Sequence, residues 1–201
     1  MENILKLEEG HTREMLYRAP YFANMLWTSV SEIQSFLKKR PDFKFGKGGS
    51  IITQDDYEAR SLKDLRNSSI ETLKKFTDTR YTPMASIRAI EKFKEFKKNN
   101  PNFKYDTVYE CTYPERNKID LLREHPESNA SFFDRLVREC HNVAQIAVEL
   151  SYHPGTCWVT KEEDQALRDN GYVTNRPLGW KVAYIECGIE AKRYGNCVNC
   201  K

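Results

Sequence analysis

The chain has 201 residues, of which 39% are hydrophobic and 12% aromatic, enough apolar material to pack the core of one domain. Charged residues make up 30% of the sequence, and no apolar run approaches the roughly 20 residues that a membrane-spanning helix needs. We therefore expect no membrane partner. The first residues lack the basic and apolar regions of a signal peptide, so we expect an intracellular, cytoplasmic protein with reduced cysteines.

Helix start and stop signals predict six helices. Several begin at a Ser or Thr that is followed three residues later by an acid, the capping-box spacing that satisfies the free amides of a first turn. Thr160 with Glu163 is one such start, and Pro83 occupies a first helical position after Thr82. The predicted helices cover residues 30–39, 54–66, 69–78, 83–98, 131–151 and 161–169.

Alternating or aromatic-rich segments predict five strands, of which the last two form a C-terminal hairpin followed by a cysteine-bearing tail. The helix at 131–151 carries apolar residues at intervals of three and four, so we expect it at the centre of the core. Together these elements predict a single α+β domain over residues 1–201, with a weak sub-boundary near 114–129. Its sheet would be mixed or antiparallel and covered mainly on one face by about six helices. The predicted strands cover residues 21–28, 105–112, 155–159, 172–174 and 180–187.

The C-x-x-C motif formed by Cys197 and Cys200 is the clearest chemical pattern in the chain. Two thiolates at this spacing can hold one side of a tetrahedral zinc site, which needs two further ligands. Cys157 and Cys187 belong to predicted strands and would complete the site, and His153 in place of Cys187 gives an equally acceptable ligand set. The alternative is that no metal binds and that Cys157 and Cys187 are small core residues.

Residues 60–104 form a basic segment, with twelve basic and five acidic side chains and hence a net charge of +7 within a chain whose net charge is +3. Lysines interleaved with phenylalanines would contact phosphates and stack on bases, so the segment predicts a nucleic-acid surface. The alternative is the solvated flank of a helix whose aromatic side chains face the core. The candidate nucleic-acid-binding residues are Lys92, Lys94, Lys97, Lys98 and Lys104.

The sequence contains no phosphate-binding loop, dinucleotide-binding fingerprint, zinc-protease motif or nucleophile elbow. We therefore predict a non-enzymatic accessory or binding protein that meets nucleic acid or an acidic protein surface through its basic segment, with a zinc-held C-terminus. The alternative is a small transferase that acts on a nucleotide or nucleic-acid substrate, using the glycine-rich residues Gly46–Ser50 and Arg18.

Overall fold

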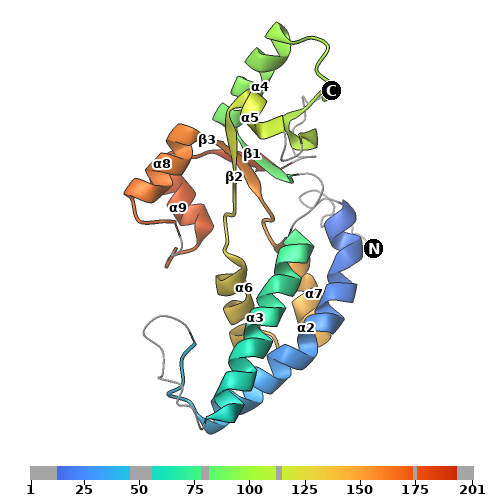
Figure 1. Ribbon diagram of the computed structural model, residues 1–201, viewed down its shortest axis with the longest axis vertical. Helices are drawn as coiled ribbons and strands as arrows, with labels where there is room; N and C mark the ends of the chain where they lie inside the picture. Colours follow the sequence, from blue (N-terminus) through green and yellow to red (C-terminus); the bar gives the residue numbers. More distant parts are fainter. Residues whose placement is uncertain (1–12, 46–55, 78–81, 112–114, 174–175, 194–201) are drawn as a thin grey trace. The chain divides into compact units, whose positions relative to one another are not determined.

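The computed structural model describes residues 13–45, 56–77, 82–111, 115–173 and 176–193 (Figure 1). The chain divides into two compact units whose segments alternate along the sequence. This grouping does not test whether each unit folds alone, so the single domain 1–201 and the weak boundary near 114–129 stay predictions. Unit 1 comprises Met1–Arg13, Thr77–Ser128 and His153–Lys201, and unit 2 comprises Glu14–Phe76 and Asn129–Tyr152.

The described part of unit 2 is helical, and its helices share one apolar core. Its elements are α2 (Arg13–Lys39), α3 (Tyr57–Thr77), α6 (Asn129–Glu139) and α7 (Val143–Tyr152) (Figure 1). α3 joins the predicted helices 54–66 and 69–78 into one. The core side chains include Phe22, Leu26, Ile33, Phe36, Phe43, Leu73, Phe76, Phe132, Phe133, Leu136, Ile146 and Leu150.

Residues 21–28 lie inside α2, so the predicted strand there is wrong, and the predicted helix 30–39 is the second half of the same helix. Phe22, Leu26 and Val30 follow one another at four-residue intervals and are all buried. That interval places them on one face of a helix, whereas a strand would present every second residue to the core. Packing of the helical stripe outweighs the strand preference of the local aromatic residues.

The predicted long core helix 131–151 is also wrong, because the chain breaks there into α6 and α7. Asn142 Oδ1 accepts a hydrogen bond from the Gln145 backbone N–H at 2.9 Å. Gln145 Oε1 in turn accepts one from the His141 N–H at 2.6 Å. This reciprocal arrangement resembles a capping box built on asparagine and glutamine, and it starts a new helix within an apolar pattern that runs on unbroken.

Two polar contacts hold α6 against the long helices of unit 2. Gln34 on α2 donates from Nε2 to the carbonyl oxygens of Val137 and Cys140, at 2.8 and 2.7 Å, and so satisfies the free end of α6. Arg66 on α3 donates to both carboxylate oxygens of Asp134, at 2.8 and 2.7 Å. This bidentate geometry fixes the orientation of the helices as well as their contact.

Unit 1 contains a mixed four-stranded sheet with the strand order β2-β3-β1-β4. The strands are β1 (Met84–Ser86), β2 (Leu121–Glu124), β3 (Cys157–Thr160) and β4 (Ala191–Arg193). β1 and β3 are parallel, whereas β4 pairs antiparallel with β1 and β2 antiparallel with β3. The prediction of an α+β protein with a mixed sheet is confirmed, and the predicted strand 155–159 corresponds to β3.

Helices cover both faces of this sheet, which corrects the expectation that they lie mainly on one (Figure 1). Ala85 and Trp158 pack in an apolar cluster with α4, whereas Met84, Cys157 and Val159 pack in another with α8 and α9. Neighbouring residues along a strand point to opposite faces, so the two clusters lie on opposite sides of the sheet. The helical elements of unit 1 are α4 (Ile87–Asn99), the 3-10 turn η1 (Val108–Glu110), α5 (Arg116–Ile119), α8 (Lys161–Asp169) and α9 (Trp180–Glu186).

The predicted C-terminal hairpin is wrong, because the second of its strands is the helix α9. Trp180, Ala183 and Tyr184 recur at the spacing of a helix and pack in the same apolar cluster. Gly179 and Gly188 flank the helix with φ values of 86° and 65°, a left-handed conformation that glycine adopts without strain. The predicted helix 161–169, by contrast, is confirmed as α8.

The predicted strand 105–112 contains the 3-10 turn η1 instead. Glu110 Oε2 accepts hydrogen bonds from the backbone N–H groups of Asp106 and Thr107, both at 3.0 Å. These local bonds stabilise a turn where the alternation of side chains indicates a strand. The predicted helix 83–98 corresponds to α4, which begins four residues later than expected.

Candidate functional site

The carboxyl ends of the parallel strands β1 and β3 lie side by side, and a helix begins directly after each strand. We call this region the carboxyl edge. Ser86 starts α4, and its Oγ accepts a hydrogen bond from the Ala89 N–H at 3.0 Å. Thr160 starts α8, and its Oγ1 accepts one from the Glu163 N–H at 3.3 Å. The two helices leave toward opposite faces of the sheet, and α/β sheets generally bind ligands at such points of divergence.

The Glu163 side chain lies between the two helix starts and is 2% exposed. Its Oε2 accepts a hydrogen bond from the Thr160 backbone N–H at 2.8 Å and another from Ser86 Oγ at 2.6 Å. A carboxylate at this place interacts favourably with the partial positive charge of both helix N-termini. The chain therefore supplies its own anion to the buried part of the carboxyl edge.

Two lysines and one aspartate meet in the solvent-facing part of the carboxyl edge, beside the exposed Glu162. Lys161 Nζ lies 2.5 Å from Asp120 Oδ1, and Lys92 Nζ lies 3.0 Å from Asp120 Oδ2. Asp120 has a left-handed φ of 59°, which aspartate tolerates better than most residues, and its carbonyl oxygen also accepts from Lys92 Nζ at 3.1 Å. The side chains of Lys161, Asp120 and Lys92 are 60%, 48% and 32% exposed, so a ligand can reach all three.

The charges at the carboxyl edge shift one another's pKa values. The pKa of Asp120 is lowered, chiefly by its hydrogen bond to Lys161 and then by that to Lys92. The pKa of Lys161 is raised by the same contact with Asp120. The pKa of Glu162 is lowered first by a hydrogen bond from its own backbone amide and then by one from Thr160, as expected for an acid in the first turn of a helix. Both the lysines and the start of α8 thus favour negative charge here.

The candidate nucleic-acid-binding lysines do not form one surface. Lys92 belongs to the carboxyl edge, whereas Lys97 donates to the carbonyl oxygens of Phe103 and Tyr105, at 2.5 and 2.9 Å, and so holds the chain after α4. Lys92 and Lys97 are five residues apart on a helix, which separates their directions by about 140°. Lys104 makes an ion pair of 2.9 Å with Glu115.

The two remaining candidates, Lys94 and Lys98, are exposed on α4. Glu91 and Glu95 share this exposed face, so its charge is mixed. A mixed face of this kind is typical of an ordinary solvated helix surface. Of the five lysines, only Lys92 lies in a cluster of converging charged groups.

Two of the predicted zinc ligands, Cys157 and Cys187, belong to one apolar cluster of unit 1. Cys157 is fully buried in β3, and Cys187, after α9, packs against the same apolar cluster. His153 is buried and accepts a hydrogen bond at Nδ1 from the Gly155 N–H at 2.9 Å. Among the residues that the structure describes, no group of three potential ligands converges on a metal position. Cys197 and Cys200 lie outside the described residues, so the zinc site stays a prediction.

Burial raises the pKa of every described thiol. Burial raises the pKa of Cys111 to about 12 and that of Cys140 to about 11. Burial also raises the pKa of Cys157 well above its usual value and, to a smaller degree, that of Cys187. A thiol needs to be deprotonated to act as a nucleophile, so these four cysteines act as core residues when no metal is bound.

A second polar cluster, which we call the Arg176 clamp, lies at the carboxyl end of β2. Arg176 makes an ion pair of 2.5 Å with Glu124, and the two side chains are 10% and 9% exposed. Arg176 also donates to the Tyr172 carbonyl oxygen at 3.0 Å, and the Tyr184 hydroxyl donates to the other oxygen of Glu124. Burial raises the pKa of Glu124 against the opposing effect of Arg176. Because its polar groups are directed at one another, the clamp acts as a structural tie.

Of the residues of the transferase alternative, the structure describes only Arg18. Arg18 donates to the Lys75 carbonyl oxygen at 2.5 Å, and its guanidinium lies over the rings of Phe22 and Phe76. These contacts pack it against the core of unit 2. Gly46–Ser50 lies outside the described residues.

Sequence reasoning identified Lys92 and the Thr160–Glu163 capping box, but it missed Asp120 and Lys161 as site residues. No local motif marks Asp120, because its partners lie 28 residues before it and 41 residues after it. Comparison of the chain with protein-family models, curated proteins and solved structures gave no match. No helix in the described ranges has the length and apolar character needed to cross a membrane.

Proposed function

We propose that the protein is an intracellular, non-enzymatic binding protein whose carboxyl edge binds the phosphates of a nucleic acid. The observation that carries this proposal is the convergence of Lys92 and Lys161 on the two oxygens of Asp120, beside the starts of two helices. The exposed groups of the carboxyl edge carry two positive charges, on the lysines, and two negative charges, on Asp120 and Glu162. A phosphate group offers more acceptor oxygens than a carboxylate and would take the place of Asp120 between the ammonium groups.

The chemistry of the carboxyl edge supports binding rather than catalysis. Ser86 Oγ lies 2.6 Å from Glu163 Oε2, which is the distance of a nucleophile from its base. However, Ser86 is 0% and Glu163 2% exposed, so no substrate reaches them. The accessible groups are two ammonium ions and the carboxylates of Asp120 and Glu162, and the ammonium ions attract and orient a phosphate without attacking it.

The free thiols support an intracellular location. The four cysteines within the described ranges, Cys111, Cys140, Cys157 and Cys187, are not joined in disulfides. Cytoplasmic proteins keep their thiols reduced, whereas secreted proteins generally join them. The zinc-held C-terminus remains part of the proposal and has its own test below.

The test is the salt dependence of binding to a fluorescent single-stranded DNA of about 20 nucleotides, measured by anisotropy. We expect the Lys92→Ala, Lys161→Ala variant to bind at least about tenfold more weakly than the wild type. The slope of log K against log salt should fall by about 1.4, because each phosphate contact on a single strand contributes about 0.7. Asp120→Asn should bind more tightly, since asparagine tolerates the same backbone conformation and removes the competing charge.

The comparison variant is Lys94→Ala, Lys98→Ala, which removes the same number of positive charges from the exposed face of α4. A larger loss of DNA affinity in this variant than in Lys92→Ala, Lys161→Ala would place the nucleic acid on the exposed face of α4 that carries Lys94 and Lys98. That result would contradict the proposed site. Failure of the wild type to bind DNA would contradict the proposed function. Binding of polyglutamate with the same dependence on Lys92 and Lys161, and no binding of DNA, would assign the site to an acidic protein surface instead.

A further inference from the structure

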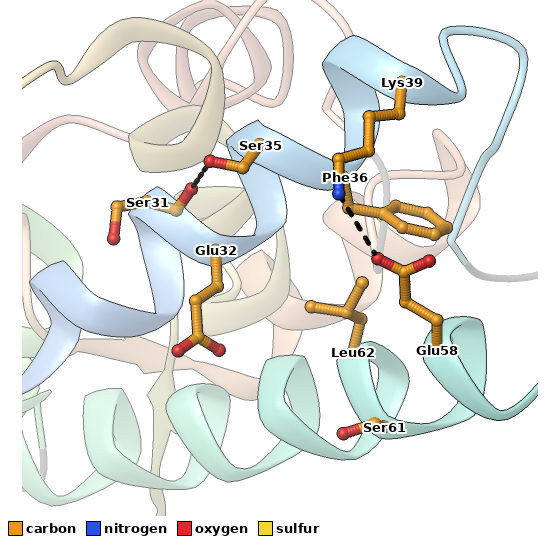
Figure 2. Close-up of a pocket in the computed structure, with 8 residues that line it drawn as sticks. All are labelled: Ser31, Glu32, Ser35, Phe36, Lys39, Glu58, Ser61 and Leu62. Carbon is orange, nitrogen blue, oxygen red and sulfur yellow. Dashed lines mark hydrogen bonds and ion pairs between the residues drawn. The ribbon is translucent and has the colours of Figure 1, made fainter.

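A groove of about 420 Å³ runs between α2 and α3 in unit 2 (Figure 2). Its floor is apolar and is formed by Phe36 from α2 and Leu62 from α3, which are both buried. Its walls are polar, with two carboxylates, three serine hydroxyls and the ammonium group of Lys39. This volume falls within the range of small-molecule sites. A narrow apolar floor with polar walls suits a ligand that has an apolar middle and polar groups beside it.

Two of the serine hydroxyls in the walls donate their hydrogens to backbone carbonyls of α2. Ser31 Oγ donates to the Thr28 carbonyl oxygen at 2.9 Å, and Ser35 Oγ donates to the Ser31 carbonyl oxygen at 2.8 Å. Each hydroxyl has a single hydrogen, so these two serines present only lone pairs to the groove. These lone pairs suit a ligand that carries N–H groups, whereas the ammonium group of Lys39 in the same wall pairs weakly with Glu58.

The two carboxylates of the groove also favour a ligand that carries positive charge. Within the described residues Glu32 makes no hydrogen bond or ion pair, and its carboxylate extends toward α3 (Figure 2). Glu58 lies 3.9 Å from Lys39, and both side chains are more than 60% exposed, so this is a weak pair that another cation can displace. Figure 2 shows Leu62 between the carboxylates of Glu32 and Glu58. The groove thus has negative groups on both sides of an apolar centre.

From this arrangement we infer that the groove binds a linear aliphatic polyamine, with one ammonium at Glu32, another at Glu58 and the hydrocarbon spacer over Phe36 and Leu62. The seven residue steps from Glu32 to Lys39, which pairs with Glu58, span about 10 Å of α2, and this length accommodates an extended chain. The volume accommodates about 14 water-sized groups, and so a triamine with its hydration. This site is separate from the carboxyl edge and binds a ligand of opposite charge.

The experiment is titration calorimetry of the full-length protein with spermidine, in low salt and without nucleic acid. Glu32→Gln should weaken binding by about tenfold, because it removes a charge-assisted hydrogen bond. Asp64→Asn is the matched control, since Asp64 is exposed on α3 about 200° around the helix from Leu62, and it should change the affinity less than about twofold. Lys39→Ala should tighten binding, because it frees Glu58 from its competitor.

Further ligands separate the inferred site from simpler explanations. 1,8-Octanediol has a hydrocarbon spacer without charges and should not compete with spermidine. Absence of spermidine binding to the wild type would overturn the inference, and so would equal losses in Glu32→Gln and Asp64→Asn. Magnesium that binds with the same dependence on Glu32 and displaces spermidine would reduce the groove to a simple cation site. A lysine-rich peptide that binds where spermidine does not would assign the groove to a protein partner.

Discussion

Replacement of Glu163 by alanine tests how the two helix starts at the carboxyl edge are held together. Glu163 Oε2 accepts hydrogen bonds from Ser86 Oγ at 2.6 Å and from the Thr160 N–H at 2.8 Å. A hydrogen bond to a charged group contributes about 1.5–3 kcal/mol, and water cannot replace the carboxylate at a buried position. The variant also avoids the cost of burying a carboxylate. We therefore expect the free energy of unfolding to fall by about 2–4 kcal/mol.

Urea unfolding followed by circular dichroism measures this change. With a slope of about 2 kcal/mol per molar urea, the midpoint should move down by about 1–2 M while the slope stays unchanged. Gln165→Ala is the matched control, because Gln165 is exposed on the same helix and lies away from the carboxyl edge. The control should change the free energy of unfolding by no more than about 0.5 kcal/mol.

A double-mutant cycle with Ser86→Ala separates the link between the helices from the capping of α8 alone. If Glu163 ties both starts, the two substitutions together should cost less than the sum of the single ones, with a coupling energy of at least about 1 kcal/mol. Two results would refute the reasoning. One is a loss in Glu163→Ala no larger than that of Gln165→Ala, and the other is a coupling energy below about 0.5 kcal/mol.

Three further predictions concern the clamp, the edge aspartate and the C-terminal cysteines. Arg176→Met should lower the free energy of unfolding by about 3 kcal/mol because it leaves a buried carboxylate unpaired, whereas Arg168→Met, which breaks an exposed pair, should cost less than about 0.5 kcal/mol in the same urea assay. The pKa of Asp120 is lowered from its ordinary value of 3.8, so its ion pairs stabilise the protein fully at pH values above 3.8. This stabilisation is lost as the pH falls through the lowered pKa. The difference in thermal stability between the wild type and Asp120→Asn should therefore shrink in acid. Elemental analysis should find zinc in the wild type and none in the Cys197→Ser, Cys200→Ser variant, and a zinc-free wild type would contradict the clasp.

The parts of the fold that local hydrogen bonds specify were predictable. The Thr160–Glu163 capping box predicted the start of α8, and the structure contains both reciprocal bonds. Two of the wrong predictions concern segments that contain similar local hydrogen bonds. Asn142 with Gln145 divides the predicted helix 131–151, and Glu110 forms a turn within the predicted strand 105–112.

Other errors arose because one stretch of sequence fits two periods. The residues of α9 suit a strand when every second residue is counted, and a helix when Trp180, Ala183 and Tyr184 are counted. The structure adopts the helix because that face packs against Met84 and Cys157 of the sheet. Sequence alone does not contain the surface against which the residues pack, so tertiary contacts decide between such alternatives.

The carboxyl edge was accessible to sequence reasoning only in part. The +7 charge of residues 60–104 pointed to Lys92 together with four other lysines, with nothing to rank them. The structure distinguishes them, because Lys92 meets Asp120 while Lys97 is used to hold its own loop. Charge composition says how many cations a segment carries, but not which of them the fold brings together.

By itself, the sequence determined the α+β fold class and the helices whose ends are marked by local hydrogen bonds. The side chains and amides that form these bonds lie within four residues of one another. Tertiary structure alone decided that β1 and β3 lie in parallel, because strands of three and four residues carry too little periodicity to mark their partners. The same pairing brings Ser86 to Glu163 across 77 residues of sequence. The candidate site exists because distant segments share one edge of the sheet, and no short-range signal encodes that proximity.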